Sequence, residues 1–158
     1  MKPMKLVRYR PEYREAIIEL HHSAIGGLVT GIDQHDEEAD LRDIEKVYFN
    51  DGGEFLVGLL EGRVIAMGGF QRVSDTSAEL RRMRIQPDLQ GQGYGTQLLR
   101  ELERLALQSG IYTLSFETAR ARPLTLEFYH KHGYQETGHG FYGKVETVHF
   151  SKTLNNSL

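Results

Sequence analysis

The sequence has no cysteine, no tryptophan and only four prolines among its 158 residues. Without cysteine the chain forms no disulfide bond, offers no thiolate nucleophile and provides no cysteine-ligated zinc or iron–sulfur site. Any group transfer by this chain is therefore expected to proceed without a covalent cysteine intermediate. The absence of cysteine also fits a reducing compartment, and we expect a cytoplasmic protein.

The sequence also lacks a large excess of charge of one sign and has no long apolar run. The chain carries 19 Lys and Arg against 22 Asp and Glu, a net charge of −3, whereas nucleic-acid binders are usually basic. No apolar run approaches the roughly 18 residues that span a bilayer, and the start MKPMKLVRYR lacks the apolar stretch of a signal peptide. We therefore predict one soluble domain over residues 1–158, with neither nucleic acid nor a membrane as partner.

Apolar periodicity predicts strands and helices along the whole chain. Short strands are predicted at Lys5–Tyr9, Phe55–Leu60, Val64–Phe70, Ala78–Ile85, Thr113–Thr118, Tyr134–Thr137 and Lys144–Phe150. Helices are predicted after Pro11, around Leu41–Tyr48, over Gly95–Gln108 and over Pro123–His132, and a glycine-rich turn at Gly138–Gly143. This order predicts an α/β (α+β) domain whose mixed sheet is antiparallel early and parallel across the Gly95–Gln108 helix.

Glycine, in contrast, is abundant, with 17 residues. Three glycines alternate in Gln90-Gly91-Gln92-Gly93-Tyr94-Gly95, between a predicted strand and a long predicted helix. Alternate glycines let the backbone turn tightly and approach a ligand closely. The helix that follows offers unpaired N–H groups and the positive end of its dipole. The segment from Gln90 to Thr96 therefore predicts an anion site suited to phosphate.

Two known phosphate-binding motifs fit this segment poorly. A P-loop ends in Gly-Lys-Ser/Thr, but Gly95 is followed by Thr96 and Gln97. The dinucleotide fingerprint G-x-G-x-x-G, started at Gly91, misses its last glycine at Thr96, although Glu117 stands roughly 20 residues on, as a ribose-binding acid would. A nucleotide-binding module and a purely structural glycine turn remain minor alternatives.

The residues around these glycines carry a resemblance to a known family. The stretch ELRRMRIQPDLQGQGYG, from Glu79 to Gly95, resembles motif A of the GCN5-related N-acetyltransferase (GNAT) family, in which Q/R-x-x-G-x-G/A opens a helix. Gln90, Gly93 and Gly95 occupy its fixed positions. The stretch Phe128-Tyr129-His130-Lys131-His132-Gly133-Tyr134 resembles the second motif of the family. The resemblance implies a three-layer sandwich, with a mixed, mostly antiparallel sheet of about seven strands and about four flanking helices.

The same resemblance implies an acyltransferase that uses acetyl-CoA as cosubstrate, without a metal. Its acceptor would be a primary amine of a small molecule or peptide, attacking directly in a ternary complex. The edge of Met83, Arg84 and Ile85 would pair with the pantetheine arm like an added strand, and an N–H near Met83 would polarise the thioester carbonyl. The pyrophosphate would face the backbone N–H groups of Gln90, Gly91, Gln92, Gly93, Tyr94, Gly95 and Thr96.

The chemistry needs a base and an acid, because a primary amine with a pKa near 10.4 must lose a proton before it attacks. From the positions used in family members, the base is Glu79 or Glu117, and both stay open. Glu79 would share a face with Arg81 in a regular strand, which would weaken it, unless a β-bulge changes its facing. Tyr129 matches the acid that protonates the departing thiolate. Arg122 replaces a frequent Asn and is expected to meet a CoA phosphate.

The acidic run Asp33, Asp36, Glu37, Glu38 and Asp40 is expected to be a solvated helix start, where acids suit the helix dipole. The family places acceptor-binding elements in this region, which allows a cationic amine. Family members are commonly homodimers, although the sequence identifies no interface. A catalytically silent member that binds CoA as a sensor is the main alternative to an enzyme.

Overall fold

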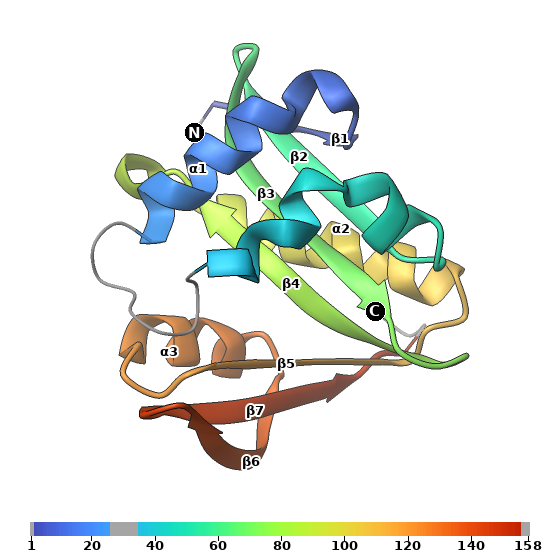
Figure 1. Ribbon diagram of the computed structural model, residues 1–158, viewed down its shortest axis with the longest axis vertical. Coiled ribbons are helices and arrows are strands. Elements are labelled where there is room, and N and C mark those ends of the chain that lie inside the picture. Colours follow the sequence, from blue (N-terminus) through green and yellow to red (C-terminus); the bar gives the residue numbers. More distant parts are fainter. Residues whose placement is uncertain (1, 26–34, 156–158) are drawn as a thin grey trace.

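The computed structural model describes residues 2–25 and 35–155. Its centre is a seven-stranded sheet in the order β1-β2-β3-β4-β5-β7-β6 (Figure 1). The strands are β1 (Lys5–Arg8), β2 (Glu54–Leu60), β3 (Arg63–Arg72), β4 (Ser77–Ile85), β5 (Thr113–Ala119), β6 (Gln135–Tyr142) and β7 (Val145–Thr153). The helices are α1 (Arg14–Ile25), α2 (Tyr94–Gln108) and α3 (Pro123–Lys131), with short segments η1 (Pro11–Tyr13), η2 (His35–Arg42), η3 (Glu45–Phe49) and η4 (Pro87–Leu89).

The sheet is mixed, as the order of predicted elements indicated. Every neighbouring pair of strands is antiparallel except β4 and β5. These two are parallel because α2 connects them as a crossover. Figure 1 shows α1 and η2 in front of the sheet and α2 behind it. The predicted three-layer architecture, with helices on both faces of a mixed sheet, is thus confirmed.

Each helical layer packs on its own hydrophobic core. Beneath α1, η2 and η3 this core is Tyr9, Ile17, Leu20, Leu41, Ile44, Tyr48, Phe55, Val57 and Met67. On the other face, Leu98, Leu99, Leu102 and Ala106 of α2 are fully buried at helical spacing. Full burial of each leucine contributes roughly 1.5–3 kcal/mol. No helix among the described residues is long and apolar enough to cross a membrane.

The helix predicted around Leu41–Tyr48 is two irregular pieces. The segment η2 is a 3₁₀ helix, and η3 is a π-helical turn in which the Asn50 N–H donates to the Glu45 carbonyl. Leu41 and Tyr48 are nevertheless both fully buried beside the sheet. Tertiary packing of the apolar side chains therefore overrides regular helix spacing here.

The predicted turn at Gly138–Gly143 is wrong, because most of it is strand. Gly138 pairs with His149 and Gly140 pairs with Thr147, as β6 continues through this segment beside β7. Gly143, with φ +61°, is where the hairpin turns. Glycine weakens a strand, but the backbone ladder to β7 supplies the hydrogen bonds that hold these glycines extended.

The strands β4 and β5 stay paired for a short distance. Their ladder ends at the pair Glu79–Ser115, whereas β4 continues to Ile85 and β5 to Ala119. Figure 1 shows the two strands diverging toward the end of β4. Near this point Arg82 has a left-handed backbone, with φ +60°, and the register between β3 and β4 shifts. The end of β4 therefore presents a strand edge toward the diverging β5.

Gly69 of β3 has no room for a side chain. A Cβ there would lie 2.4 Å from the Glu54 carbonyl oxygen and 2.7 Å from the Phe55 ring. We expect Gly69→Ala to lower the free energy of unfolding by about 1–3 kcal/mol, the usual effect of overpacking. Gly140→Ala in β6 is the matched control, because its nearest contact would be at 3.8 Å. Urea unfolding measures both variants, and equal losses would contradict this account.

Candidate active site

The glycine segment forms a tight turn at the start of α2. Gly91 and Gly93 have left-handed backbones, with φ +77° and +95°, and Gly93 is the N-cap of α2. Gln90 Nε2 donates to the Ile85 carbonyl at 3.1 Å, which closes the turn back on β4. No heavy atom of the described residues lies within 4 Å of a Cβ built on Gly91, apart from its chain neighbours. With open space before it, the turn can hold an anion on the first N–H groups of α2.

Two side chains of this segment tie α2 to its neighbours. Tyr94 is buried, and its hydroxyl donates to the Lys2 carbonyl at 2.8 Å. Thr96 Oγ1 lies 2.9 Å from Nε2 of His132, at the end of α3. Tyr94 and Thr96 can therefore contribute backbone N–H groups to an anion site, while their side chains fix its position.

The helix α3 meets the glycine turn closely. A Cβ on Gly95 would lie 3.4 Å from the ring of Phe128, so the first turn of α2 packs directly on α3. Arg122 is the N-cap residue of α3, directly before Pro123. The structure thus brings the second sequence motif, which α3 carries, against the first.

The predicted pantetheine edge lies where β4 leaves β5. Met83, Arg84 and Ile85 are all partly buried. The Met83 side chain faces α2, because a Cβ on Gly68 would lie 2.7 Å from Met83 Sδ and 3.3 Å from Leu98. Arg84 Nη1 donates to the Met83 carbonyl at 3.0 Å, which draws this side chain along the strand edge. The edge is continuous with the glycine turn through the bond from Gln90 to Ile85.

Tyr129 projects from α3 into the core beside β5. Its side chain is 6% exposed, and its ring centroid lies 4.2 Å from that of Phe116 and 5.0 Å from that of Phe128. Burial raises the pKa of the Tyr129 hydroxyl, and the charge of Arg84 opposes that rise. The phenol therefore stays protonated at neutral pH and is a potential proton donor near the edge of β4.

Glu117 lies on the opposite face of β5 from Tyr129. The strand alternates, so that Phe116 is buried toward α3 and Glu117 is exposed on the side of α1. Glu117 accepts a hydrogen bond from Thr147 Oγ1, and its Oε2 lies 3.3 Å from His149 Nε2. Sequence reasoning missed both partners, which the register of β7 brings to Glu117. Among the described residues, no three His, Asp or Glu side chains form a group that could hold a metal ion.

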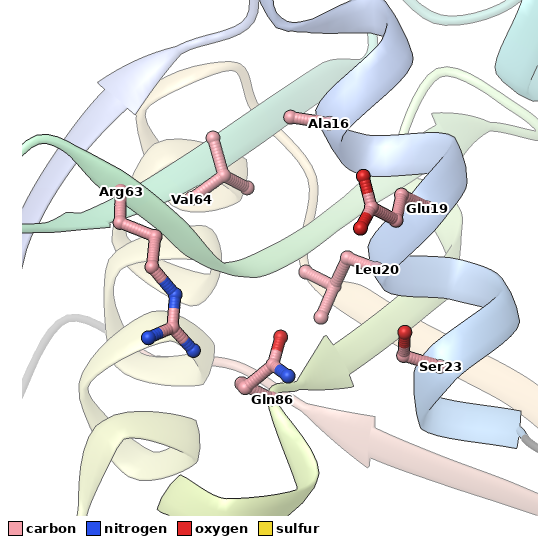
Figure 2. Close-up of a pocket in the computed structure, with 7 residues that line it drawn as sticks. All are labelled: Ala16, Glu19, Leu20, Ser23, Arg63, Val64 and Gln86. Carbon is pink, nitrogen blue, oxygen red and sulfur yellow. The ribbon is translucent and has the colours of Figure 1, made fainter.

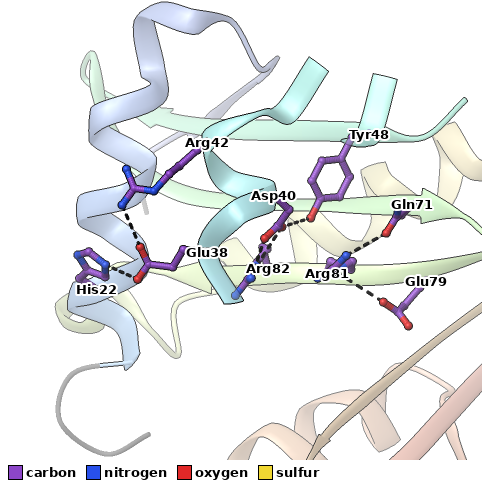
Figure 3. A network of polar contacts seen from close by, with 9 residues as sticks. All are labelled: His22, Glu38, Asp40, Arg42, Tyr48, Gln71, Glu79, Arg81 and Arg82. Atoms are coloured by element: carbon purple, nitrogen blue, oxygen red, sulfur yellow. Dashed lines mark hydrogen bonds and ion pairs between the residues drawn. The ribbon is translucent and has the colours of Figure 1, made fainter. Parts of the chain in front are cut away.

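Glu79 belongs to the last pair of the β4–β5 ladder and is also exposed. Its Oε1 lies 3.6 Å from Arg81 Nε, and Arg81 Nη1 donates to Gln71 at 2.9 Å (Figure 3). This is the pairing expected of a regular strand, because the irregularity of β4 comes after Arg81, at Arg82. The guanidinium of Arg81 therefore competes with any amine for the Glu79 carboxylate.

The prediction of a fully solvated acidic run is wrong for Asp40. Asp40 is 7% exposed and binds Arg82 and Tyr48, as Figure 3 shows. Its spacing of four from Ile44 and eight from Tyr48 places it on the apolar face of this segment, a signal that the sequence contained. Asp33 of the same run lies outside the described residues.

Glu38, in contrast, forms ion pairs near the surface. Its carboxylate pairs with His22 of α1 and with Arg42 of η2 (Figure 3). Both partner side chains are more than half exposed. These pairs join η2 to α1, whereas Asp40 joins η2 to the sheet.

A pocket of about 360 Å³ lies between α1 and the sheet, beside the end of β4 (Figure 2). It is lined by Ala16, Glu19, Leu20, Ser23, Arg63, Val64 and Gln86. Figure 2 shows the charged groups of Glu19 and Arg63 and the amide of Gln86 directed toward the same space. No residue predicted for the cofactor or for catalysis lines this pocket. It is continuous in sequence with the edge of β4, because Gln86 directly follows Ile85.

Curated relatives and solved structures that are similar to this chain include acetyltransferases. The chain is 31% identical over 127 residues to the amino-acid acetyltransferase of Azotobacter vinelandii, a match over 79% of this chain but 28% of that relative. A GNAT-family acetyltransferase from Staphylococcus aureus has the same fold, with a TM-score of 0.87 and 20% identity over 97% of this chain and 100% of that one. PaiA N-acetyltransferase from Thermoplasma acidophilum, in complex with coenzyme A, gives a TM-score of 0.79 and 19% identity over 96% and 99%.

Sequence similarity extends through both motifs. The model of the Acetyltransferase (GNAT) family matches residues 12–134, from η1, directly before α1, to the end of the second motif. This range contains the glycine turn, the edge of β4 and Tyr129. The chain therefore belongs to the GNAT acetyltransferase family.

Proposed function

We propose that this protein is an acetyl-CoA-dependent N-acetyltransferase that acts on a primary amine of a small molecule or peptide. The observation that carries the proposal is the divergence of β4 from β5 directly beside the glycine turn of α2. A strand edge next to a helix N-terminus suits a ligand with an amide-bearing arm and a pyrophosphate. Coenzyme A has both, and PaiA N-acetyltransferase is a structural neighbour in complex with it.

The residues present fit this cosubstrate. Backbone N–H groups from Gln90 to Thr96 would bind the pyrophosphate, and the edge Met83-Arg84-Ile85 would pair with the pantetheine arm. Arg122, at the start of α3, would meet a phosphate. The acetyl thioester supplies the activated acyl group, and the chain supplies position and proton transfer.

We assign the proton transfers to the two faces of the sheet. Glu117 would accept the proton that the amine loses, and the N–H of Met83 would stabilise the negative charge on the thioester oxygen. Tyr129 would donate a proton to the departing sulfur. We favour Glu117 over Glu79 as the base because the guanidinium of Arg81 is paired with the Glu79 carboxylate, whereas the partners of Glu117 among the described residues are a hydroxyl and an imidazole. Glu117 also lies beyond the end of the β4–β5 ladder.

The acceptor class rests on the relative from Azotobacter vinelandii, which is an amino-acid acetyltransferase. That name supports an amino group as the acceptor. This chain matches only 28% of that protein, so the similarity does not identify the amine. A screen of amino acids, polyamines and peptides, with detection of the free thiol released from acetyl-CoA, would identify it. A protein that binds acetyl-CoA but releases no thiol with any amine would instead be a sensor.

Gly93 tests the cofactor site. Its φ of +95° is a conformation that a β-branched residue adopts only with strain. We expect the wild-type protein to bind acetyl-CoA and Gly93→Val to weaken that binding at least about tenfold, or 1.4 kcal/mol. Isothermal titration calorimetry measures both dissociation constants.

Gly62→Val is the matched control for Gly93→Val, since Gly62, in the β2–β3 turn, has φ +81° and no described residue other than its chain neighbours within 4 Å of a Cβ built on it. It should cost stability without loss of affinity. Absence of acetyl-CoA binding by the wild type would falsify the proposal, and binding of NAD in its place would favour a dinucleotide module.

Glu117→Gln and Glu79→Gln identify the base. We expect Glu117→Gln to lower kcat by about 10²–10⁴-fold near pH 7, the usual contribution of a general base. Glu79→Gln should lower it less than tenfold, and both variants should keep the wild-type affinity for acetyl-CoA. Steady-state kinetics across pH, with calorimetry as the control, makes the comparison. The reverse ranking would move the base to Glu79.

Tyr129→Phe has a pH signature besides its loss of kcat. Burial raises the pKa of Tyr129 above the value near 10 of an unfolded tyrosine, so the folded state binds this proton more tightly. The stability linked to it is fully present below pH 10 and is lost as pH rises above 10. We expect the free energy of unfolding to fall less steeply above pH 10 in Tyr129→Phe, by up to about 1.4 kcal/mol per pH unit.

The control for Tyr129→Phe is Tyr112→Phe, because Tyr112 is 49% exposed. Urea unfolding between pH 9 and 11 separates the two variants. Identical slopes would argue against a buried, protonated phenol at position 129, and an unchanged kcat would reject its role as the acid.

A further inference from the structure

A buried polar cluster joins three elements on the face of the sheet that carries Glu79. Its members are Asp40 of η2, Tyr48 of η3 and Arg82 of β4, which are 7%, 0% and 8% exposed. Arg82 Nη2 and Nε donate to the two carboxylate oxygens of Asp40 at 2.7 and 3.1 Å. The Tyr48 hydroxyl donates to Asp40 Oδ2 at 2.6 Å (Figure 3). We call these three residues the Asp40 cluster.

Each member of the Asp40 cluster depends on the other two. A buried guanidinium without a counter-charge is strongly unfavourable, and a buried carboxylate is equally so. Tyr48 has no exposed surface, and burial followed by the charge of Asp40 raises the pKa of its hydroxyl, which therefore remains a donor. The bidentate geometry also fixes the direction of the Arg82 side chain.

The backbone of Arg82 is as constrained as its side chain. Its φ of +60° lies in the left-handed region, which is unfavourable for any residue with a Cβ. The register between β3 and β4 shifts here, between Met67 and Gly69, which is a β-bulge. Such a conformation persists only where the surrounding structure holds it.

The bulge sets the facing of the residues around it. Arg81 contacts Gln71 and Arg82 contacts Asp40, so two consecutive side chains reach the face covered by η2 and η3. Met83 then lies on the other face, beside Leu98 of α2. In a regular strand consecutive side chains would alternate, and Met83 would share the face of Arg81. The bulge therefore determines how the edge after Arg82 meets the space left by β5.

We infer that Asp40 is a positioning residue for the cosubstrate slot. By holding Arg82 in its left-handed conformation, Asp40 keeps the edge Met83-Arg84-Ile85 turned away from β5 and open to a paired ligand. This inference rests on the proposed function. The Asp40 cluster also connects η2 directly to the strand that carries this edge.

Asp40→Asn tests the inference, because it keeps the shape of the side chain and removes its charge. Two ligands distinguish binding at the edge Met83-Arg84-Ile85 from binding at the glycine turn. Acetyl-CoA would contact both, whereas adenosine 3′-phosphate 5′-diphosphate has the pyrophosphate of CoA but no pantetheine and would contact only the glycine turn. We expect Asp40→Asn to weaken acetyl-CoA at least about tenfold and to leave the second ligand unchanged. We also expect kcat to fall by between about 10- and 100-fold, as for a misplaced reacting group.

The matched control is Glu38→Gln, which removes a carboxylate from the same segment. Glu38 pairs with His22 and Arg42 near the surface and does not touch the sheet through those pairs. It should leave the affinity ratio of the two ligands as in the wild type. If Asp40→Asn fails to fold, Tyr48→Phe removes only the hydroxyl that donates to Asp40, and a smaller change in the same direction is expected.

Hydrogen–deuterium exchange gives a readout that needs neither ligand nor activity. In Asp40→Asn, exchange should rise in residues 80–86, at the bulge, and stay unchanged in β2. A variant that is less stable but has wild-type exchange at 80–86 and a wild-type affinity ratio would overturn the inference and leave Asp40 a purely structural residue. If the wild type itself does not bind acetyl-CoA, the proposed function fails, and the exchange comparison decides whether Asp40 holds the bulge.

Discussion

The parallel ladder between β4 and β5 ends after three residue pairs, and the rest of the molecule is arranged around that end. Backbone groups of a strand need hydrogen-bond partners, and an unpaired edge inside a sheet is normally costly. Here the edge of β4 beyond Glu79 is not closed by β5. On one side of it lie the glycine turn and Tyr129, and on the other lie Glu117 and the pocket beneath α1. An edge that is held open between these two sets of groups is a place where a ligand can complete the sheet.

A sheet that divides in this way needs something to hold its halves together. The helix α2 does so, because its buried Leu98 and Leu102 belong to one core with Leu80 of β4 and with Phe116 of β5 and Phe150 of β7. The bond between Thr96 and His132 adds a polar link from α2 to α3. The two halves are therefore fixed through the layer below the gap, and the gap itself can remain without strand pairing.

Local patterns in the sequence were sufficient to predict the elements whose conformation depends on residues nearby in the chain. The spacing of Leu98, Leu102 and Ala106 predicted α2, and the alternate glycines predicted the turn before it, because Gly91 and Gly93 have backbones that other residues adopt with strain. Resemblance to the second motif pointed to Tyr129, whose role as the acid stays a prediction. Each of these signals comes from one continuous stretch of the sequence.

Contacts between distant segments could not be predicted in the same way. Asp40 and Arg82 are 42 residues apart, so although the spacing of Asp40 from Ile44 and Tyr48 marks it as the carboxylate on the apolar face, that spacing does not indicate which arginine it binds. The pairing of Glu117 with His149 depends on the register of β5 against β7, which is set by the packing of the whole sheet. Gly138 and Gly140 suggested a turn because glycine favours turns locally, but the ladder to β7 outweighs that preference.

The same distant contacts resolve a difficulty in the electrostatics of the proposed reaction. The strand that carries the edge Met83-Arg84-Ile85 contains Arg81, Arg82 and Arg84, whereas the proposed amine acceptor would arrive as a cation. Two unit charges 4 Å apart interact by about 4 kcal/mol at an effective dielectric constant of 20, so unmatched arginines would repel the acceptor.

Both arginines on the acceptor face are matched, Arg81 by Glu79 at 3.6 Å and Arg82 by Asp40 at 2.7 Å. Glu117 has no such partner among Lys and Arg side chains of the described residues, since it contacts a hydroxyl and an imidazole. Its carboxylate therefore keeps a negative charge that can attract the cationic amine of the proposed reaction. A strand rich in arginine can therefore serve the proposed cationic acceptor, because the ion pair with Asp40 offsets the charge of Arg82 and the ion pair with Glu79 offsets the charge of Arg81.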